Sequence, residues 1–475
     1  MKKKVLLLFC LMILVGCSNG KPKEPAERIS ALVGKEYLAK YGETISVEEA
    51  IKIARERNLD LKTKKLEREI ASLDKKIAFG NFLPSINLMG GYTRLDNEID
   101  LDVDMSSLKN GISKLPIPPF NKIGSLIPSS MTSRFVDKSF YSYGISAQMP
   151  IFVPSTWYLY SARKKGEKIS ELVEQLADKM IQLQVMGQYY YILALESEHE
   201  ALINELKSAK ELENKAKVSL KVEAILSWEY EKAQAFVKIK EFGLNENEKD
   251  LKVAKMNFLK TLNINPLEEI KLDDTIVFSE NIPTMEECIY EAISGNEMLK
   301  ITETGKDINK DIKKIAITNF LPKIILGGGY VNNSNEILSD SSFLYGNVTG
   351  ILSIFNGFKN VNEYKKAVRK EKIAELKLEK EFMTTIVETV RAYQNVEKTQ
   401  ELQYISELNF KAEKGKLYQK KSERSVNLIG DEEYFSALSS YEQALSMKKK
   451  ADFQYAMALG SLKIAMGKNP FEEGK

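Results

Sequence analysis

The 475-residue sequence has little of the chemistry on which most enzymes and metal sites depend. It contains one histidine and three cysteines. Cys10 and Cys17 lie at the extreme N-terminus, which leaves only Cys288 in the body of the chain. A disulfide framework and a Cys/His zinc site are therefore both excluded. We interpret the single histidine, His199, as a solvated surface residue, because it lies in a highly charged helical stretch with no acid–base partners around it.

Several catalytic and cofactor motifs are also absent. The sequence has no Gly-rich phosphate loop, no nucleophile elbow and no HExxH motif. We therefore predict that the protein is not an enzyme and needs no cofactor. Beyond the N-terminus, no stretch approaches eighteen unbroken apolar residues, so no transmembrane helix is expected. If the mature protein enters a membrane, it must do so as a closed β-barrel, because only a barrel or a helix satisfies its backbone groups in lipid.

What is abundant is balanced charge and helix-forming sequence. There are 69 basic and 66 acidic residues, and their interleaving indicates solvated helix faces, with no nucleic-acid-binding surface. Only 13 prolines and 26 glycines interrupt the chain, and they are clustered. Most of the chain is therefore free to be helical.

The N-terminus has the pattern of an export signal. Three lysines precede about eleven apolar residues, Val5 to Val15, which is too short to span a bilayer but suits a signal-peptide core. The segment ends Leu-Val-Gly-Cys and resembles the bacterial lipobox. That resemblance implies cleavage after residue 16 and lipid attachment to Cys17, with Ser18 favouring sorting to the outer membrane. Residues 17–45 would then form a lipid-anchored tether. An ordinary secretory signal with a coincidental cysteine is the alternative.

The body of the chain is a tandem duplication. The tetrapeptide Asn-Phe-Leu-Pro occurs at 81–84 and again at 319–322, and we call the spacing between these two copies the repeat shift. Over residues 77–92, eleven of sixteen positions are identical to their partners in 315–330. Chance would give about one identity, taking roughly 6% per position from average residue usage. We assign a first repeat to 46–262, a linker to 263–284, a second repeat to 285–467 and a tail to 468–475.

Each repeat changes from helical periodicity to strand periodicity at this tetrapeptide. Proline cannot continue a helix and pushes the residue before it into extended geometry. The pattern predicts a helix, two strands and a long helical hairpin in each repeat. The first repeat should have a helix at 47–80, strands from 86 and at 141–149, a long exposed loop between them, and helices at 156–221 and from 227 to about 262. The second should have a helix at 285–319, strands at 323–332 and 344–354, and helices at 360–422 and from 431 to about 465.

Four strands per chain cannot close a barrel. An open edge in lipid leaves backbone groups unpaired, at a cost of several kcal/mol each. If the strands enter a membrane, the chain must therefore oligomerise. Three copies would supply twelve strands, within the size range of membrane barrels, and the long helices would form a tube that continues the barrel. The expected fold class is mainly α with a membrane β-barrel, formed by a trimer on an α-helical tunnel.

This order of elements resembles the TolC-like outer-membrane efflux proteins, and the lipobox is similar to that of their acylated members. The likeness includes Asn-Phe-Leu-Pro before the first strand and Pro-Ile-Phe or Ile-Phe-Asn-Gly after the second. It implies a homotrimeric channel that serves as the exit duct of a tripartite efflux system, with a periplasmic adaptor protein and an inner-membrane pump. A type I protein-secretion duct is an alternative within the same class. A structural coiled-coil lipoprotein without a pore is the alternative from a different class.

The resemblance also implies roles for the ends of the two helical hairpins. Matching the family's tip motif on Ala437 puts Asn427 at its glycine, Glu433 at its first acidic position and Ser436 at its second. Three copies of Glu433 would form a carboxylate ring and a cation-selective constriction; the alternative is an ordinary solvated glutamate. Four apolar residues at the hairpin turns would contact the adaptor, or else pack within their own hairpins: Ile225, Leu226, Leu428 and Ile429.

Overall fold

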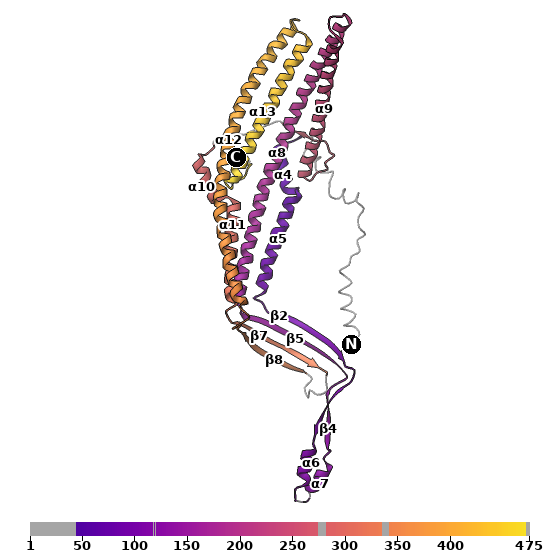
Figure 1. The fold of residues 1–475 in the computed structure, drawn as a ribbon, viewed down its shortest axis with the longest axis vertical. Coiled ribbons are helices and arrows are strands. Elements are labelled where there is room, and N and C mark those ends of the chain that lie inside the picture. The colour runs from indigo at the N-terminus through magenta and orange to yellow at the C-terminus, as the bar shows by residue number, and fades with distance from the viewer. Residues whose placement is uncertain (1–43, 117, 119, 274–281, 335–341, 472–475) are drawn as a thin grey trace. The chain divides into compact units, whose positions relative to one another are not determined.

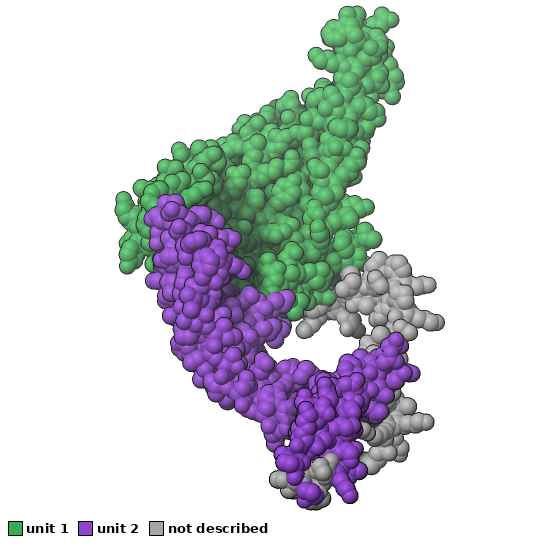
Figure 2. Space-filling view, turned by 60° about the horizontal axis from the view of Figure 1, so that its bottom comes forward, with its two compact units in different colours: residues 1–68, 170–301, 378–475 green, residues 69–169, 302–377 purple. Residues whose placement is uncertain are grey.

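The computed structural model describes residues 44–116, 118, 120–273, 282–334 and 342–471. The predicted signal peptide, Cys17, most of the tether and an apolar run at 275–278 lie outside these residues. The chain divides into two compact units (Figure 2). Unit 1 contains residues 1–68, 170–301 and 378–475, and unit 2 contains residues 69–169 and 302–377. Each unit is therefore built from both repeats.

The helices confirm the duplication, because each long helix in the first repeat has a counterpart in the second (Figure 1). The first-repeat helices are α4 (Val47–Arg57), α5 (Leu59–Gly80), α8 (Pro154–Lys221) and α9 (Ser227–Thr261). Their counterparts are α10 (Met285–Gly295), α11 (Glu297–Thr318), α12 (Lys359–Ser425) and α13 (Asp431–Ala465). Both long hairpins, α8–α9 and α12–α13, occur where the sequence predicts them.

The core of unit 1 is also duplicated. In the first repeat, α4, α8 and α9 enclose a cluster that includes Ile53, Tyr189 and Phe258, each at most 1% exposed. The Tyr189 hydroxyl lies 2.9 Å from the Ile45 carbonyl oxygen and 2.7 Å from that of Asp273. Burial raises the pKa of Tyr189 well above its usual value. A smaller second-repeat cluster surrounds Cys288.

The predicted single helices at 47–80 and 285–319 are wrong in one respect, because each is broken by an asparagine. Asn58 ends α4 with ψ at 131°, outside the helical range. Its Oδ1 accepts the N–H groups of Asp60 (2.9 Å) and Leu61 (3.1 Å) and so caps α5, while its Nδ2 donates to the Thr261 carbonyl at 2.8 Å. Asn296 is the equivalent residue of the second repeat, and its Nδ2 donates to the Ala465 carbonyl at 3.0 Å. At both breaks, the asparagine side chain caps the next helix and also contacts the end of α9 or α13.

We expect Asn58→Ala to lower the free energy of unfolding by about 2 kcal/mol, because it removes a helix N-cap and leaves the buried Thr261 carbonyl without this donor. Asn58→Asp is the matched control, since it keeps the cap acceptor but loses the donor. Chemical denaturation of the detergent-solubilised protein measures both. An alanine variant as stable as the natural protein would show that the break does not depend on this side chain.

Unit 2 contains a four-stranded antiparallel sheet in the order β2-β5-β7-β8 (Figure 1). Its strands are β2 (Ser85–Arg94), β5 (Ser139–Phe152), β7 (Lys323–Asn333) and β8 (Ser342–Ile351). The centre of the sheet joins the two repeats, because β5 pairs with β7 along most of its length. The predicted strands are confirmed, although β8 ends before the predicted Ile354.

The residues between β2 and β5 contain regular secondary structure, where the sequence predicts only a loop. They form an antiparallel ribbon, β3 (Ile99–Asp104) with β4 (Ser130–Val136), and two short helices, α6 (Ser106–Ser113) and α7 (Phe120–Leu126). β3 lies within the acidic segment 96–104, where Ile99, Leu101 and Val103 alternate with aspartates. The segment is exposed over most of its described residues, as predicted, but it contains strands and helices that the sequence did not predict.

The Asn-Phe-Leu-Pro tetrapeptide is the junction between helix and sheet in both repeats. Each helix ends in a tight turn, in which Phe82 N–H donates to Phe79 and Leu83 N–H donates to Gly80; Phe320 and Leu321 repeat this pattern. The strand begins at the residue after the proline in both cases. In the first repeat, aromatic rings surround the junction at centroid separations of 5.8–6.2 Å: Phe79, Phe82, Phe152, Trp157 and Tyr160.

The expected tether, linker and tail are partly structured. β1 (Thr44–Ile45), at the end of the predicted tether, pairs in parallel with β6 (Lys271–Leu272), within the predicted linker. Ile270 beside β6 is 4% exposed and joins the first-repeat core. In the tail, Lys468 pairs with Glu291 at 2.6 Å and Phe471 packs against the same core. Parts of all three segments therefore contact the rest of the protein.

Candidate functional site

One face of the four-stranded sheet carries exposed apolar side chains on every strand. The ladder places Leu88 opposite Ile145, Ile145 opposite Tyr330, and Tyr330 opposite Leu344, so alternate residues of all four strands share this face. Leu88 is 78% exposed and Leu344 is 83% exposed. The exposed apolar members of this face are Ile86, Leu88, Tyr92, Tyr141, Tyr143, Ile145, Met149, Leu326, Leu344 and Val348. We call this set the apolar sheet face.

The opposite face of the same sheet is different in chemistry. It carries Asn87, Ser142, Ser146, Gln148, Asn347 and Thr349, together with larger, mostly apolar side chains: Met89, Phe140, Ile325, Val331, Phe343, Tyr345 and Ile351. The two faces of the sheet are therefore unlike: one is apolar and exposed, and the other carries most of the polar side chains among larger apolar ones. The first and last strands, β2 and β8, are both edge strands of this sheet. Each edge can pair with a further strand.

Comparison with known proteins agrees with this geometry. No protein-family model and no curated protein matches the chain. Solved structures do match it. The Campylobacter jejuni CmeC outer membrane channel is similar over 90% of this chain and 87% of its own, with a TM-score of 0.70 and 16% identity.

Two further solved structures are similar to the chain over most of its length. The open state of the Neisseria gonorrhoeae MtrE outer membrane channel is similar over 89% of both chains, with a TM-score of 0.65 and 17% identity. The outer membrane protein VceC from Vibrio cholerae is similar over 89% of this chain and 96% of its own, with a TM-score of 0.64 and 11% identity. The chain has the outer-membrane channel fold. This confirms the predicted fold: mainly helical, with long helical hairpins and four antiparallel strands.

In this channel fold, the ends of the two hairpins are closed by the same turn. Glu223 and Asn427 both have positive φ, 56° and 58°. The N–H of Ala224 donates to the Ser219 carbonyl, and the N–H of Leu428 donates to the Glu423 carbonyl. Each of these bonds belongs to a Schellman motif. Asparagine tolerates this conformation, so Asn427 fits a turn that favours glycine; its match to the family's glycine position stays a prediction. Glu223 adopts it without that advantage.

The four predicted contact residues at these turns divide into two pairs. Leu226 and Leu428 are exposed, at 64% and 75%, whereas Ile225 and Ile429 are half-buried. Three further exposed apolar residues, which were not predicted, lie beside them: Val222, Trp228 and Val426. The turns therefore present an apolar surface built mainly from leucine, valine and tryptophan. A role in binding a partner remains a proposal.

The predicted constriction residues lie at the start of α13. Glu433 is exposed, and its carboxylate lies 3.5 Å from Lys420 Nζ on α12. Ser436 lies about one turn further along the same helix. The neighbouring carboxylates are also paired, Asp431 with Arg424 at 2.8 Å and Glu432 with Lys215 at 2.7 Å. Glu433 is thus the most loosely held of three carboxylates at this helix N-terminus, where the helix dipole favours negative charge.

The Glu432–Lys215 pair joins the two hairpins and was not predicted. Ser208 Oγ also donates to the Glu432 carbonyl at 3.3 Å, so α8 holds the start of α13 at two points. Its hydrogen bond to Glu432 raises the pKa of Lys215. Sequence periodicity cannot detect this contact, because its partners stand 217 residues apart. The lone histidine, His199, was expected to be solvated but is half-buried, with Nδ1 3.1 Å from Asn247 Oδ1.

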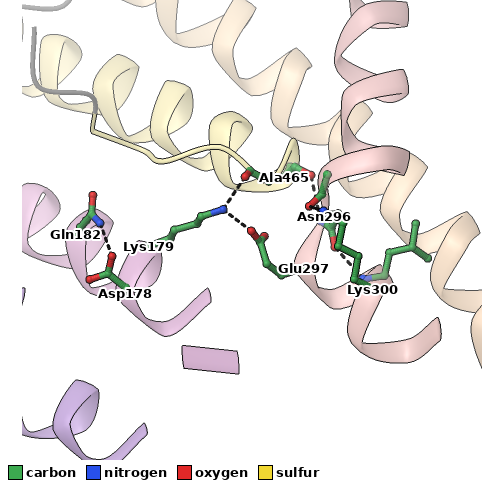
Figure 3. A network of polar contacts seen from close by, with 10 residues as sticks. Asp178, Lys179, Gln182, Asn296, Glu297, Lys300 and Ala465 are labelled. Carbon is green, nitrogen blue, oxygen red and sulfur yellow. Dashed lines mark hydrogen bonds and ion pairs between the residues drawn. The ribbon is translucent and has the colours of Figure 1, made fainter. Parts of the chain in front are cut away.

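A buried ion pair lies deeper in unit 1, where the two repeats meet (Figure 3). Lys179 of α8 donates to Glu297, the first residue of α11, and to the Gly467 carbonyl at 2.6 Å. Both side chains are at least nine-tenths buried. Gly295 and Gly467 allow their two backbone segments to lie close together, because a Cβ on either would lie 2.3–2.4 Å from a carbonyl oxygen of the other segment. No sequence pattern indicates this network. It links α8 of the first repeat to Glu297, near the start of the second repeat, and to Gly467, at its end.

Two further observations bear on function. None of the described helices is both long and apolar enough to cross a membrane. In the described part of the chain, no group of three or more His, Cys, Asp or Glu side chains is placed to hold a metal ion.

Proposed function

We propose that this protein is the trimeric outer-membrane exit duct of a tripartite efflux system. The observation that carries the proposal is the apolar sheet face, exposed on all four strands, on a sheet with two open edges. An exposed apolar surface of this extent is unusual on a protein surrounded only by water. Lipid on that face, and pairing of β8 with β2 of the next copy, would satisfy both the side chains and the backbone.

Strand direction allows several copies to close one antiparallel sheet. The four strands alternate in direction, so β8 of one copy and β2 of the next would also be antiparallel. Three copies would close a twelve-stranded barrel, and the long helices would continue it as a periplasmic tunnel. The exposed leucines at the hairpin turns would contact a periplasmic adaptor, and an inner-membrane pump would supply the energy. In this proposal, Cys17 carries the lipid that anchors the N-terminus.

Conductance tests the proposal directly. The purified protein reconstituted in planar bilayers should open discrete, long-lived channels, and native mass spectrometry of the same preparation should give the mass of three copies. Trimers that never conduct would favour the structural coiled-coil lipoprotein. Treatment of cells with globomycin should accumulate the precursor, and normal processing in its presence would remove the lipid anchor from the proposal.

The constriction at Glu433 makes a separate prediction. We expect Glu433→Gln to reduce the preference for cations and to weaken block by divalent cations by about tenfold, because a ring of three carboxylates would bind them. Glu432→Gln is the matched control, since Glu432 is held by Lys215. Reversal potentials in a salt gradient measure both variants. Equal behaviour of the two would show that Glu433 is an ordinary solvated glutamate.

A further inference from the structure

Helices α8 and α13, which belong to different hairpins, line a hollow of about 460 Å³ together with α9. Elsewhere these two helices are joined by polar contacts, such as the ion pair between Lys450 and Glu198 at 2.7 Å. At the hollow they instead bring together two carboxylates, Glu200 of α8 and Glu442 of α13. Burial raises the pKa of Glu442, and the charge of Glu200 raises it further. The negative charge of Glu442 is thus held against both burial and a like charge.

The other charged groups on the wall of the hollow do not balance these two carboxylates. Glu196 of α8 is already paired with Lys255 of α9, at 2.7 Å. Lys449 of α13 is the only cation among the described residues that line the hollow, and its charge opposes the rise in the pKa of Glu442. One lysine thus stands against two carboxylates, and one further positive charge would balance them.

Two neutral side chains of α8 on the same wall offer hydrogen-bond acceptors to such a charge. Ser197 is 6% exposed, and its Oγ has no hydrogen-bond partner among the described residues. The second is His199, whose tautomer is set by Asn247. Asn247 Nδ2 donates to the Leu195 carbonyl at 3.4 Å, which directs its Oδ1 to Nδ1 of His199, 3.1 Å away. Neutral His199 therefore carries its proton on Nδ1 and keeps Nε2 as an acceptor.

The walls of the hollow suit an organic cation better than a metal ion. The acidic and histidine side chains of the hollow, like those elsewhere in the described chain, form no group of three or more that is placed to hold a metal. Leu251 of α9 and Leu445 of α13 form part of the wall and have no ligand atoms to offer. An ammonium group brings N–H donors for carboxylate, hydroxyl and imidazole acceptors. An alkyl stem attached to it would be removed from water by the two leucines.

We propose that this hollow is a binding site for a small organic cation, a primary ammonium group on a short alkyl stem. The ammonium group lies between Glu200 and Glu442, and the stem packs against Leu251 and Leu445. Because the two carboxylates belong to different hairpins, the bound cation joins the two hairpins of one chain. All residues of the site lie within unit 1 of a single copy, so the site depends neither on the proposed trimer nor on the proposed channel function.

Calorimetric titration of the detergent-solubilised protein with butylammonium chloride tests the role of charge. We expect saturable binding of one cation per chain, and Glu442→Gln should weaken it by about tenfold or more, because a charged acceptor is lost. Glu198→Gln is the matched control, since it removes the same charge from the same turn of α8, but Glu198 is paired with Lys450 outside the hollow. Circular dichroism checks that both variants fold. Equal weakening by the two variants, or no binding to the natural protein, overturns the site.

A series of ligands tests the chemical class. Butylammonium should bind about tenfold more tightly than methylammonium, because its longer stem removes more apolar surface from water. Leu445→Ser should abolish most of that preference, and butanol, which lacks the charge, should not bind. Equal binding of the two ammonium ions would show that the leucines do not contact the stem. If magnesium chloride binds more tightly than butylammonium, and Glu442→Gln removes that binding, the site holds a metal ion and the assignment to an organic cation is wrong.

Discussion

Replacing Lys179 by methionine should cost about 3–5 kcal/mol of unfolding free energy, because Glu297 would keep its charge in a buried site without a partner. Glu297 is 6% exposed, and one of its carboxylate oxygens, Oε2, already has no hydrogen-bond partner. Loss of the cation therefore leaves little to stabilise that charge. Glu297→Leu alone should cost a similar amount, since it leaves the lysine with only the Gly467 carbonyl.

The double variant, Lys179→Met with Glu297→Leu, should restore stability to within about 1 kcal/mol of the natural protein, because buried ion pairs are often replaced by apolar residues at no net cost. Guanidinium denaturation of the four proteins forms a double-mutant cycle, and the coupling energy should exceed about 2 kcal/mol. Additive single effects would show that the two charges do not depend on each other.

Leu88→Arg should nearly abolish recovery of the protein in the outer-membrane fraction. If the apolar sheet face meets lipid, an arginine near its centre costs about 2–4 kcal/mol per copy, and a trimer would carry that cost three times. Leu88 is well placed for the test, since it is 78% exposed and its replacement removes little packing within the chain.

Asn87→Arg is the matched control, because Asn87 is the adjacent residue on the opposite, polar face of β2. It should reach the membrane in normal amount and alter conductance instead. Membrane fractionation with heat-modifiability on gels measures assembly of both variants. If Leu88→Arg assembles as well as Asn87→Arg, the apolar sheet face does not contact lipid, and the proposed channel function loses its main support.

The local features of this chain could be predicted from its sequence, because their causes are local. Pro84 lacks the N–H that a helix needs, and Leu83 before it is forced into extended geometry, so the tetrapeptide itself determines the junction of helix and strand. Alternating residues such as Tyr141 and Tyr143 define a strand with two unlike faces. Asn427 tolerates positive φ and so predicts the turn between α12 and α13. The duplication doubled the first two of these signals but not the third, because Glu223 stands where the second repeat has Asn427.

Tertiary structure alone decided where the helices break and how the repeats are joined. Asparagine is only slightly worse than its neighbours inside a helix, so Asn58 gives no clear stop signal. At the break, Asn58 also donates to the Thr261 carbonyl, 203 residues away, and this contact cannot be predicted from the local sequence. Lys179 and Glu297 each have the pattern of ordinary helix charges, and only packing brings them together across 118 residues. A contact between residues far apart in the sequence produces no periodic pattern around either residue. Such contacts are therefore seen only in the folded structure.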